Sequence, residues 1–250
     1  MRMSAYRVLA AALCMQSVFV LAACSAASAL QRGGIPSTTA ALASQPQQQS
    51  QRCLQPRVLC FSGSSRKESL NKKLAMLACK VAQRRGATAT FIDLTDFDMP
   101  IYNGDDEAKH GLPAAAVRFK SLLQQHDALI IASPEYNALP TPLLLNTLDW
   151  ASRPGRTKER HAAAFAGKTA FIVAASPTFM GGLRSAMHLR PFLGDLRMVV
   201  APRSFALPRA RTAFNEEGEL IDDKQRNKLE MMINGFVDLS TKQLQDSCSR

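Results

Sequence analysis

The chain has 250 residues, of which 46% are hydrophobic and 20% are charged, as is typical of a globular enzyme with one sizeable domain. Its net charge of +11 suits anionic ligands, but basic and aromatic residues are not interleaved, so nucleic-acid binding is not expected. Its four histidines are scattered and its six cysteines form no C-x-x-C pair, so the sequence predicts no metal site.

Residues 1–56 differ from the rest in composition, because they hold four arginines but no lysine and no acidic residue. After a basic start, residues 8–23 are mostly apolar but too few for a stable membrane span. Residues 27–29 (Ala-Ser-Ala) form a small-x-small cleavage pattern, and the Ser-, Ala- and Gln-rich stretch that follows cannot form a core. We therefore predict a targeting presequence with a disordered linker over residues 1–56 and a folded domain over residues 57–250.

The composition of this leader allows three interpretations. A signal sequence followed by an acid-free stretch resembles the two-part presequences of secondary plastids, which proteins reach by the secretory route, and this is the localisation that we predict. Residues 21–24 (Leu-Ala-Ala-Cys) also resemble a bacterial lipoprotein box, in which Cys24 would be lipidated and anchored. In the third interpretation the leader has no sorting role and the protein is cytosolic.

From Arg57 onward, strand patterns alternate with helix patterns along the chain. Short apolar or β-branched runs mark the strands, helical spacing of apolar residues marks the helices, and Gly or Pro marks many of their ends. In chain order we expect a strand over residues 57–61, a helix over 70–84, a strand over 88–94, a loop over 95–113, a helix over 113–125, a strand over 128–132, a helix over 142–150, a strand over 168–175, a helix over 184–193, a strand over 197–201 and a helix over 222–244.

This alternation predicts an α/β fold in which helices cover both faces of a parallel sheet. Five strands suit a flavodoxin-like, doubly wound, five-stranded parallel sheet in the order 2-1-3-4-5. Ligands of such sheets bind beyond the carboxyl ends of the strands, so the loops after strands one, three and four should converge on one site.

The loop after the first expected strand has a composition that suits a phosphate monoester. Residues 61–71 (FSGSSRKESLN) contain several serines, whose hydroxyls donate hydrogen bonds, and Arg66, which can bind phosphate oxygens through two N–H groups. The helix that follows offers unpaired N–H groups and a positive dipole end. The alternative is a serine-rich turn that only caps this helix.

The loops after the third and fourth strands are also unusual. Residues 133–142 (SPEYNALPTP) hold three prolines, which stiffen the loop, together with a tyrosine and an amide that suit a flat polar ring system. Residues 176–184 (SPTFMGGLR) hold paired glycines, which allow the backbone to approach a ligand closely. The alternatives are a proline-rich connection with Tyr136 packed inward, and a tight turn before a helix.

Together these segments resemble the NADPH-dependent FMN reductase family, a flavodoxin-like group that includes chromate and quinone reductases. The resemblance covers residues 57–202 and rests on four motifs that occur in order. They are G-S-x-R-x-x-S-x-N at residues 63–71, P-E-Y-N at 134–137, L-x-N-x-x-D-W-x-S-R at 144–153 and S-x-x-x-x-G-G-x-R at 176–184.

The resemblance implies that the cofactor is bound FMN, with its phosphate in the first loop, its ring along the second and the third loop closing the far side. The residues that would bind it are Ser64, Arg66, Ser69, Leu70, Asn71, Pro134, Glu135, Tyr136, Asn137, Ser176, Gly181 and Gly182. Two positions depart from the family pattern. Leu145 replaces a lysine that is usual there, and Thr178 stands where many members have glycine, which would narrow the approach to the ring. Asp149 and Trp150 are interpreted as structural, with the tryptophan in the core or in a subunit interface.

The activity implied is an NAD(P)H-dependent oxidoreductase in which NADPH or NADH reduces FMN, and FMN reduces a small acceptor such as free flavin or a quinone by a ping-pong mechanism. No catalytic side chain is expected, because the flavin carries the chemistry. The chain lacks a G-x-G-x-x-G dinucleotide motif, so the nicotinamide would bind transiently over the flavin. A homodimer or homotetramer is also implied. The alternative is a flavodoxin-type electron carrier without NAD(P)H oxidation, although such carriers are usually acidic.

Overall fold

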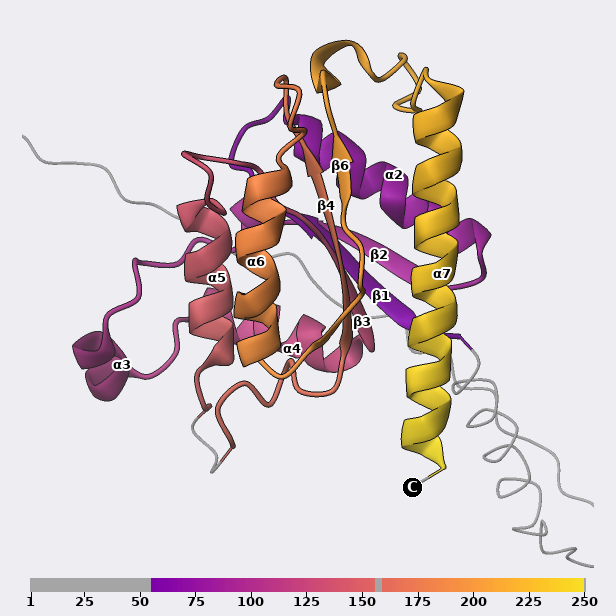
Figure 1. Cartoon of the computed structure of the whole chain (residues 1–250). Coiled ribbons are helices and arrows are strands. Elements are labelled where there is room, and N and C mark those ends of the chain that lie inside the picture. The colour runs from indigo at the N-terminus through magenta and orange to yellow at the C-terminus, as the bar shows by residue number, and fades with distance from the viewer. Residues whose placement is uncertain (1–54, 156–158, 250) are drawn as a thin grey trace, which may run out of the picture. The chain divides into compact units, whose positions relative to one another are not determined.

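The computed structural model describes residues 55–155 and 159–249 (Figure 1). The predicted presequence therefore lies almost wholly outside the described residues, and both its boundary and its sorting role stay predictions. None of the helices within the described ranges is both long enough and apolar enough to cross a bilayer.

A parallel sheet forms the centre of the described domain. Its order is β2-β1-β3-β4-β5, which confirms the predicted doubly wound α/β fold. The four full strands are β1 Arg57–Ser62, β2 Thr88–Asp93, β3 Ala128–Ala132 and β4 Thr169–Ala175. Every residue of β3 and β4 is buried, because helices cover both faces of the sheet, and this explains why both strands are almost entirely apolar.

The fifth strand differs from its prediction. In place of one strand over residues 197–201, two short strands, β5 Val199–Val200 and β6 Phe205–Leu207, pair in parallel with β4. Pro202 between them lacks a backbone N–H, and the carbonyl that precedes it accepts a hydrogen bond from the Arg190 guanidinium at 2.7 Å. The ladder along β4 is therefore interrupted and then resumes, which leaves a gap in the sheet at this position.

Helices cover the two faces of the sheet in separate groups (Figure 1). One group is α2 Leu70–Arg84 and α7 Asp223–Cys248, and the other is α4 Ala114–Gln125, α5 Pro142–Ser152 and α6 Leu183–Asp195. α7 extends past its predicted end at residue 244. Thr141 caps α5, because its hydroxyl accepts a hydrogen bond from the N–H of Leu144.

The core consists of two apolar clusters, one on each face. Val58 and Cys60 of β1 pack in the cluster that includes α2 and α7, whereas Leu59 and Phe61 pack in the cluster that includes α4, α5 and α6. This alternation follows from the two-residue period of a strand. Trp150 is 1% exposed and its indole N–H donates to the carbonyl of Pro100 at 2.8 Å, which confirms its place in the core.

The expectation of one loop over residues 95–113 is wrong, because it contains two helical segments. They are η1 Leu94–Asp96 and α3 Gly104–His110, and a third short segment, η2 Ala210–Thr212, follows β6. The α3 helix has sequence signals that the many loop-forming residues around it conceal: Asn103 caps it, acidic residues occupy its first turn and basic residues its last.

Candidate active site at the carboxyl edge of the sheet

Three loops begin side by side because β1, β3 and β4 are adjacent and parallel. The first loop leaves β1 at Gly63, whose N–H donates to the carbonyl of Ala132 at 3.0 Å. The second leaves β3 at Ser133, whose N–H donates to the carbonyl of Val173 at 2.8 Å. The structure therefore brings together the three loops that the sequence singled out. They are named here the serine loop (residues 63–69), the proline loop (133–142) and the glycine loop (176–182).

The serine loop presents hydrogen-bond donors that the protein does not use. The Ser69 hydroxyl caps α2 by accepting from the N–H of Lys72 at 3.2 Å, and the Ser64 hydroxyl accepts from the N–H of Arg66 at 3.3 Å. Both hydroxyl protons stay available to a ligand. Arg66 is exposed, and among the described residues nothing pairs with its guanidinium. With the N-terminus of α2 beside them, these groups can hold a dianionic phosphate.

Unlike the side chains of the serine loop, those in the first turn of α2 are bonded to other parts of the protein. Asn71 is buried, and its amide makes two 2.9 Å hydrogen bonds with the backbone N–H and carbonyl of Ala175, at the end of β4. The Lys72 ammonium lies 2.5 Å from a carboxylate oxygen of Asp93, at the end of β2. Burial raises the pKa of Asp93, but hydrogen bonds from Lys72 and Thr95 outweigh it and the pKa is lowered. Both side chains therefore hold the sheet edge together, and in this turn only the backbone N–H groups of Leu70 and Asn71 remain available to a phosphate.

The proline loop ends in a tight turn that displays Tyr136. The backbones of Tyr136 and Leu139 exchange two 3.0 Å hydrogen bonds, and the two residues between them, Asn137 and Ala138, have φ angles of 52° and 71°. Asparagine tolerates this left-handed conformation, but alanine adopts it at a cost of about 1–2 kcal/mol. Tyr136 is 46% exposed, so it is not packed inward. Its ring and the Asn137 amide are free to contact a planar ligand.

Glu135 has a partner that its sequence motif does not reveal. Its carboxylate pairs with the Arg184 guanidinium and accepts hydrogen bonds from the N–H groups of Arg184 and Ser185, at the start of α6. The Ser185 hydroxyl also donates to the carbonyl of Pro134 at 2.9 Å and bonds the Ser133 hydroxyl at 2.6 Å. The Glu135 carboxylate and the Pro134 carbonyl thus fix the loop to α6, so the predicted cofactor contact of Glu135 is limited to its backbone and that of Pro134 to its ring.

The glycine loop packs against the segment that follows β6. The N–H of Ser176 donates to the carbonyl of Leu207 at 3.2 Å, so Ser176 is held beside the sheet edge. A Cβ at Gly181 would lie 2.7 Å from the carbonyl carbon of Leu207 and 2.8 Å from the nitrogen of Pro208. A Cβ at Gly182 would lie 2.9 Å from that of Ala174. The paired glycines are therefore required by the chain's own packing, and a contact with the cofactor would be additional.

The donor set and the surface of this edge fit FMN. Unused hydroxyl and guanidinium donors at the serine loop suit the phosphate, and the exposed Tyr136 ring suits the flavin ring. Leu139 on the proline loop is 50% exposed and Phe179 on the glycine loop is 80% exposed, so apolar surface is available at the same edge. Among the twelve residues predicted to bind FMN, the side chains of Asn71 and Glu135 are engaged elsewhere, and the Ser176 hydroxyl bonds the hydroxyl and the N–H of Thr178.

Comparisons with known proteins point to one family. Residues 56–212 match the family of NADPH-dependent FMN reductases. The chain is 34% identical over 180 residues to an NAD(P)H-dependent FMN reductase of Pseudomonas aeruginosa, with 71% of this chain and 91% of the relative covered. It is 32% identical over 186 residues to an NADPH:quinone oxidoreductase of Arabidopsis thaliana, with 71% and 88% covered.

The fold has a close counterpart among solved structures. FerB from Paracoccus denitrificans, a flavoenzyme NAD(P)H:(acceptor) oxidoreductase, superposes with a TM-score of 0.65 at 29% identity and covers 75% of this chain and 98% of its own. The family match spans more than half of the chain and includes all three loops of the candidate site. The chain therefore belongs to the NADPH-dependent FMN reductase family.

Proposed function

We propose that this protein is an NAD(P)H-dependent oxidoreductase that reduces a quinone or free flavin. The observation that carries the proposal is the pairing, at one sheet edge, of unused phosphate donors around Arg66 with an exposed aromatic surface around Tyr136. When bound there, FMN would supply two-electron chemistry between the nicotinamide and the acceptor. The named relatives, an FMN reductase and a quinone oxidoreductase, support this class of acceptor.

In this proposal the protein's residues bind and position, and no side chain moves a proton. The serine loop holds the phosphate end, and the proline loop fixes one side of the ring through the tight turn at Asn137 and Ala138. The Glu135–Arg184 pair ties the residue before that turn to α6. The nicotinamide and the acceptor would use the same exposed surface beside Tyr136 in turn, which is the geometry of a ping-pong reaction.

Steady-state kinetics test this proposal. We expect the purified protein to be yellow, to oxidise NADPH only when an acceptor is present, and to give parallel double-reciprocal lines when NADPH and benzoquinone are varied together. Tyr136→Ala should lower kcat more than it weakens FMN binding, whereas the matched control Tyr136→Phe should keep both. Intersecting lines would rule out the shared surface, and FMN binding without NADPH oxidation would indicate an electron carrier instead.

We also propose that the protein forms a homodimer or homotetramer. Leu183 and Met187, one turn apart on α6, are 37% and 62% exposed, and Leu139 of the proline loop is 50% exposed. Exposed large apolar side chains of this kind are typical of a subunit contact. Sedimentation velocity should show an oligomer that Met187→Glu weakens, while the exposed control Met76→Glu on α2 should leave it intact.

We further propose that residues 1–56 direct the protein to a secondary plastid by the secretory route. The support is the acid-free composition and the cleavage pattern at residues 27–29. Amino-terminal sequencing of the protein from its native host should begin at Leu30 or later. An intact Met1 would contradict any targeting role, and a lipid on Cys24 would favour the lipoprotein interpretation.

A further inference from the structure

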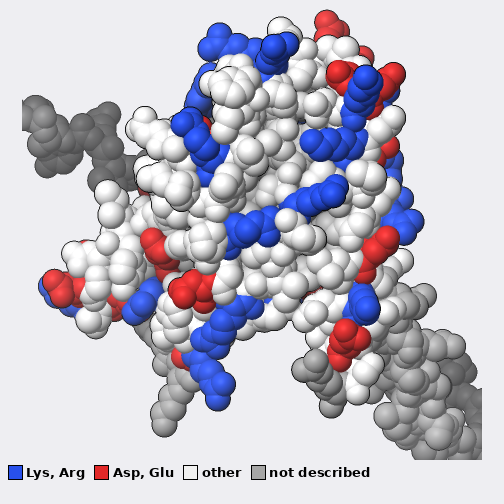
Figure 2. Space-filling view, in the orientation of Figure 1, with Lys and Arg blue, Asp and Glu red and all other residues white. Residues whose placement is uncertain are grey.

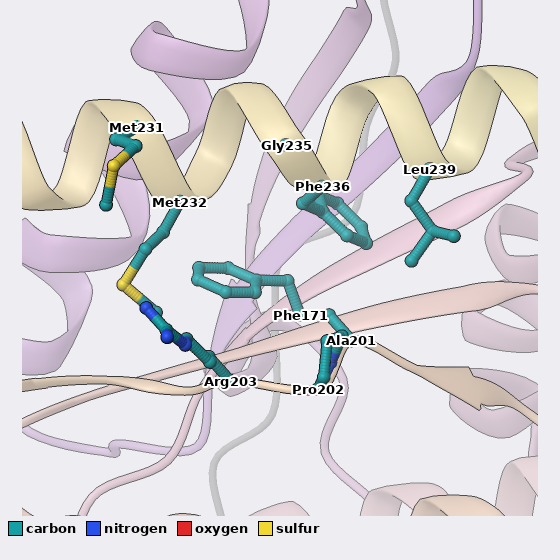
Figure 3. Close-up of a pocket in the computed structure, with 9 residues that line it drawn as sticks. All are labelled: Phe171, Ala201, Pro202, Arg203, Met231, Met232, Gly235, Phe236 and Leu239. Carbon is teal, nitrogen blue, oxygen red and sulfur yellow. The ribbon is translucent and has the colours of Figure 1, made fainter.

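An apolar cavity of about 270 Å³ lies between α7 and the interrupted edge of the sheet. Figure 3 shows its lining: Phe171 of β4 and Ala201, Pro202 and Arg203 come from the sheet side, and one face of α7 lines the other side. None of the residues predicted to bind FMN lines it. The cavity is therefore a separate feature, and it has no part in the proposed function.

Two local features of the sequence open this space. The first is the break between β5 and β6, where the proline and the Arg190 contact displace the chain from the ladder. The second is Gly235 inside α7, where a Cβ would meet no atom within 4 Å. A glycine within a helix destabilises it by about 1 kcal/mol relative to alanine. Packing does not require a glycine here, and its effect is to leave the cavity open.

The mouth of the cavity is positively charged. Arg203 is exposed, and no acidic side chain within the described ranges pairs with it. The ammonium of Lys228 lies 5.9 Å from the centre of the Phe205 ring, close to the same break in the sheet. The neighbouring acids of α7 are engaged elsewhere, because Glu230 pairs with Arg84 and Asp238 with Arg85 on α2.

We propose that this cavity binds a small amphipathic anion, a free monocarboxylate with an aliphatic chain of medium length. The apolar chain would lie along Met232 and Leu239, over the buried rings of Phe171 and Phe236, and the carboxylate would pair with Arg203 at the mouth. In Figure 3 Arg203 extends toward the part of α7 that carries Met232, as such a pairing needs. The volume is just below the range of about 300–1,000 Å³ for ligand sites, which favours a chain of medium length over a long lipid.

Methionine methyl NMR tests this proposal on the full-length protein saturated with FMN. Met231 and Met232 line the cavity and are two of the ten methionines of the chain, so labelled methyl groups report on it directly. Sodium octanoate should shift these two signals saturably and leave the others unchanged. Replacing each methionine by leucine in turn assigns the signals.

Three variants test separately whether binding needs the space of the cavity and the charge at its mouth. Gly235→Leu fills the space and should abolish the shifts, while the control Gly235→Ala adds one methyl group and should keep them. Arg203→Gln should weaken octanoate binding about fivefold, as expected for an exposed ion pair, and leave the binding of neutral 1-octanol unchanged. Circular dichroism of each variant verifies the fold.

Each of the following results would overturn the proposal. If octanoate shifts the methionine signals of Gly235→Leu as much as those of the unchanged protein, the ligand binds elsewhere. If Arg203→Gln weakens the binding of octanol as much as that of octanoate, charge has no role. A fall in sedimentation coefficient on Met231→Lys would mean that a second copy of the chain covers this face. Unchanged Met231 and Met232 signals at saturating octanoate would mean that the cavity binds no such anion.

Discussion

The serine loop and the proline loop leave neighbouring strands of the same sheet, but the polar side chains of the first are largely unpaired and those of the second are bonded to α6. In the serine loop Arg66 is exposed and unpaired within the described chain, and the hydroxyls of Ser64 and Ser69 keep their protons free. In the proline loop Glu135 is paired with Arg184, and Ser133 and its neighbours are bonded to α6. Space-filling Figure 2 shows that basic side chains are widespread on the face in view, so charge alone does not mark the site.

This difference indicates which loop mainly determines ligand affinity and which mainly determines folding stability. Groups without a protein partner contribute little to folding but are available to a ligand, whereas groups that bond one another fix the shape that the ligand meets. Substitutions in the serine loop should therefore change affinity at constant stability. Substitutions in the proline and glycine loops should change stability first.

The largest effect is expected from Gly181→Ala in the glycine loop. The residue has a φ of 63°, and the added methyl group would overlap the backbone of Leu207 and Pro208. Strain and overlap together should lower the free energy of unfolding by about 3 kcal/mol. Gly218→Ala is the control, because it has a φ of 78° but open space around it, and should cost about 1 kcal/mol. Equal losses in urea denaturation would mean that the close packing of the glycine loop contributes nothing.

Arg66→Ala is expected to weaken FMN binding by about 1.5–3 kcal/mol, the scale of a charge-assisted hydrogen bond. The free energy of unfolding of the FMN-free protein should stay the same, because the guanidinium has no described protein partner. Arg85→Ala is the control at the other end of α2, where the arginine pairs with Asp238. Fluorescence titration of FMN measures the difference. Unchanged affinity in Arg66→Ala would place the phosphate away from the serine loop.

Glu135→Gln should lower the free energy of unfolding by about 1–2 kcal/mol, because it removes the charge that pairs with Arg184 and accepts two backbone N–H groups. FMN affinity should change less than in Arg66→Ala. A double-mutant cycle with Arg184→Gln isolates the pair. If the two losses simply add, the pair does not couple the proline loop to α6, and the contrast between the two loops would fail.

The smallest effect is expected from removing residues 1–54. Both loops lie wholly within the folded domain. The melting temperature and the rate of NADPH oxidation of the truncated protein should therefore match those of the full chain. Gln55 and Pro56 should be kept, because the carbonyl of Pro56 accepts a hydrogen bond from the N–H of Thr88 in β2 at 3.0 Å. A large loss of stability on truncation would mean that the leader belongs to the domain.

The sequence alone predicted the elements that depend on local pattern. Apolar runs such as Ala128–Ala132 identified buried strands, the helix expected from residue 142 begins at Pro142, and parallel topology then required three loops to meet at one edge. Two predictions failed where breakers and short elements coincide. Helix α3 was concealed among glycines and prolines, and the fifth strand is interrupted at Pro202.

Only the tertiary structure decided how individual side chains are used. Asn71 bonds Ala175, 104 positions away, and Glu135 bonds Arg184, 49 positions away, so neither partner can be read from a local motif. The cavity beside Gly235 likewise exists only because α7 lies over the break in the sheet. Local pattern determines which groups reach the site, since it depends on neighbours in the chain. Which of those groups remain free for a ligand depends on contacts between distant segments, and these form only when the chain has folded.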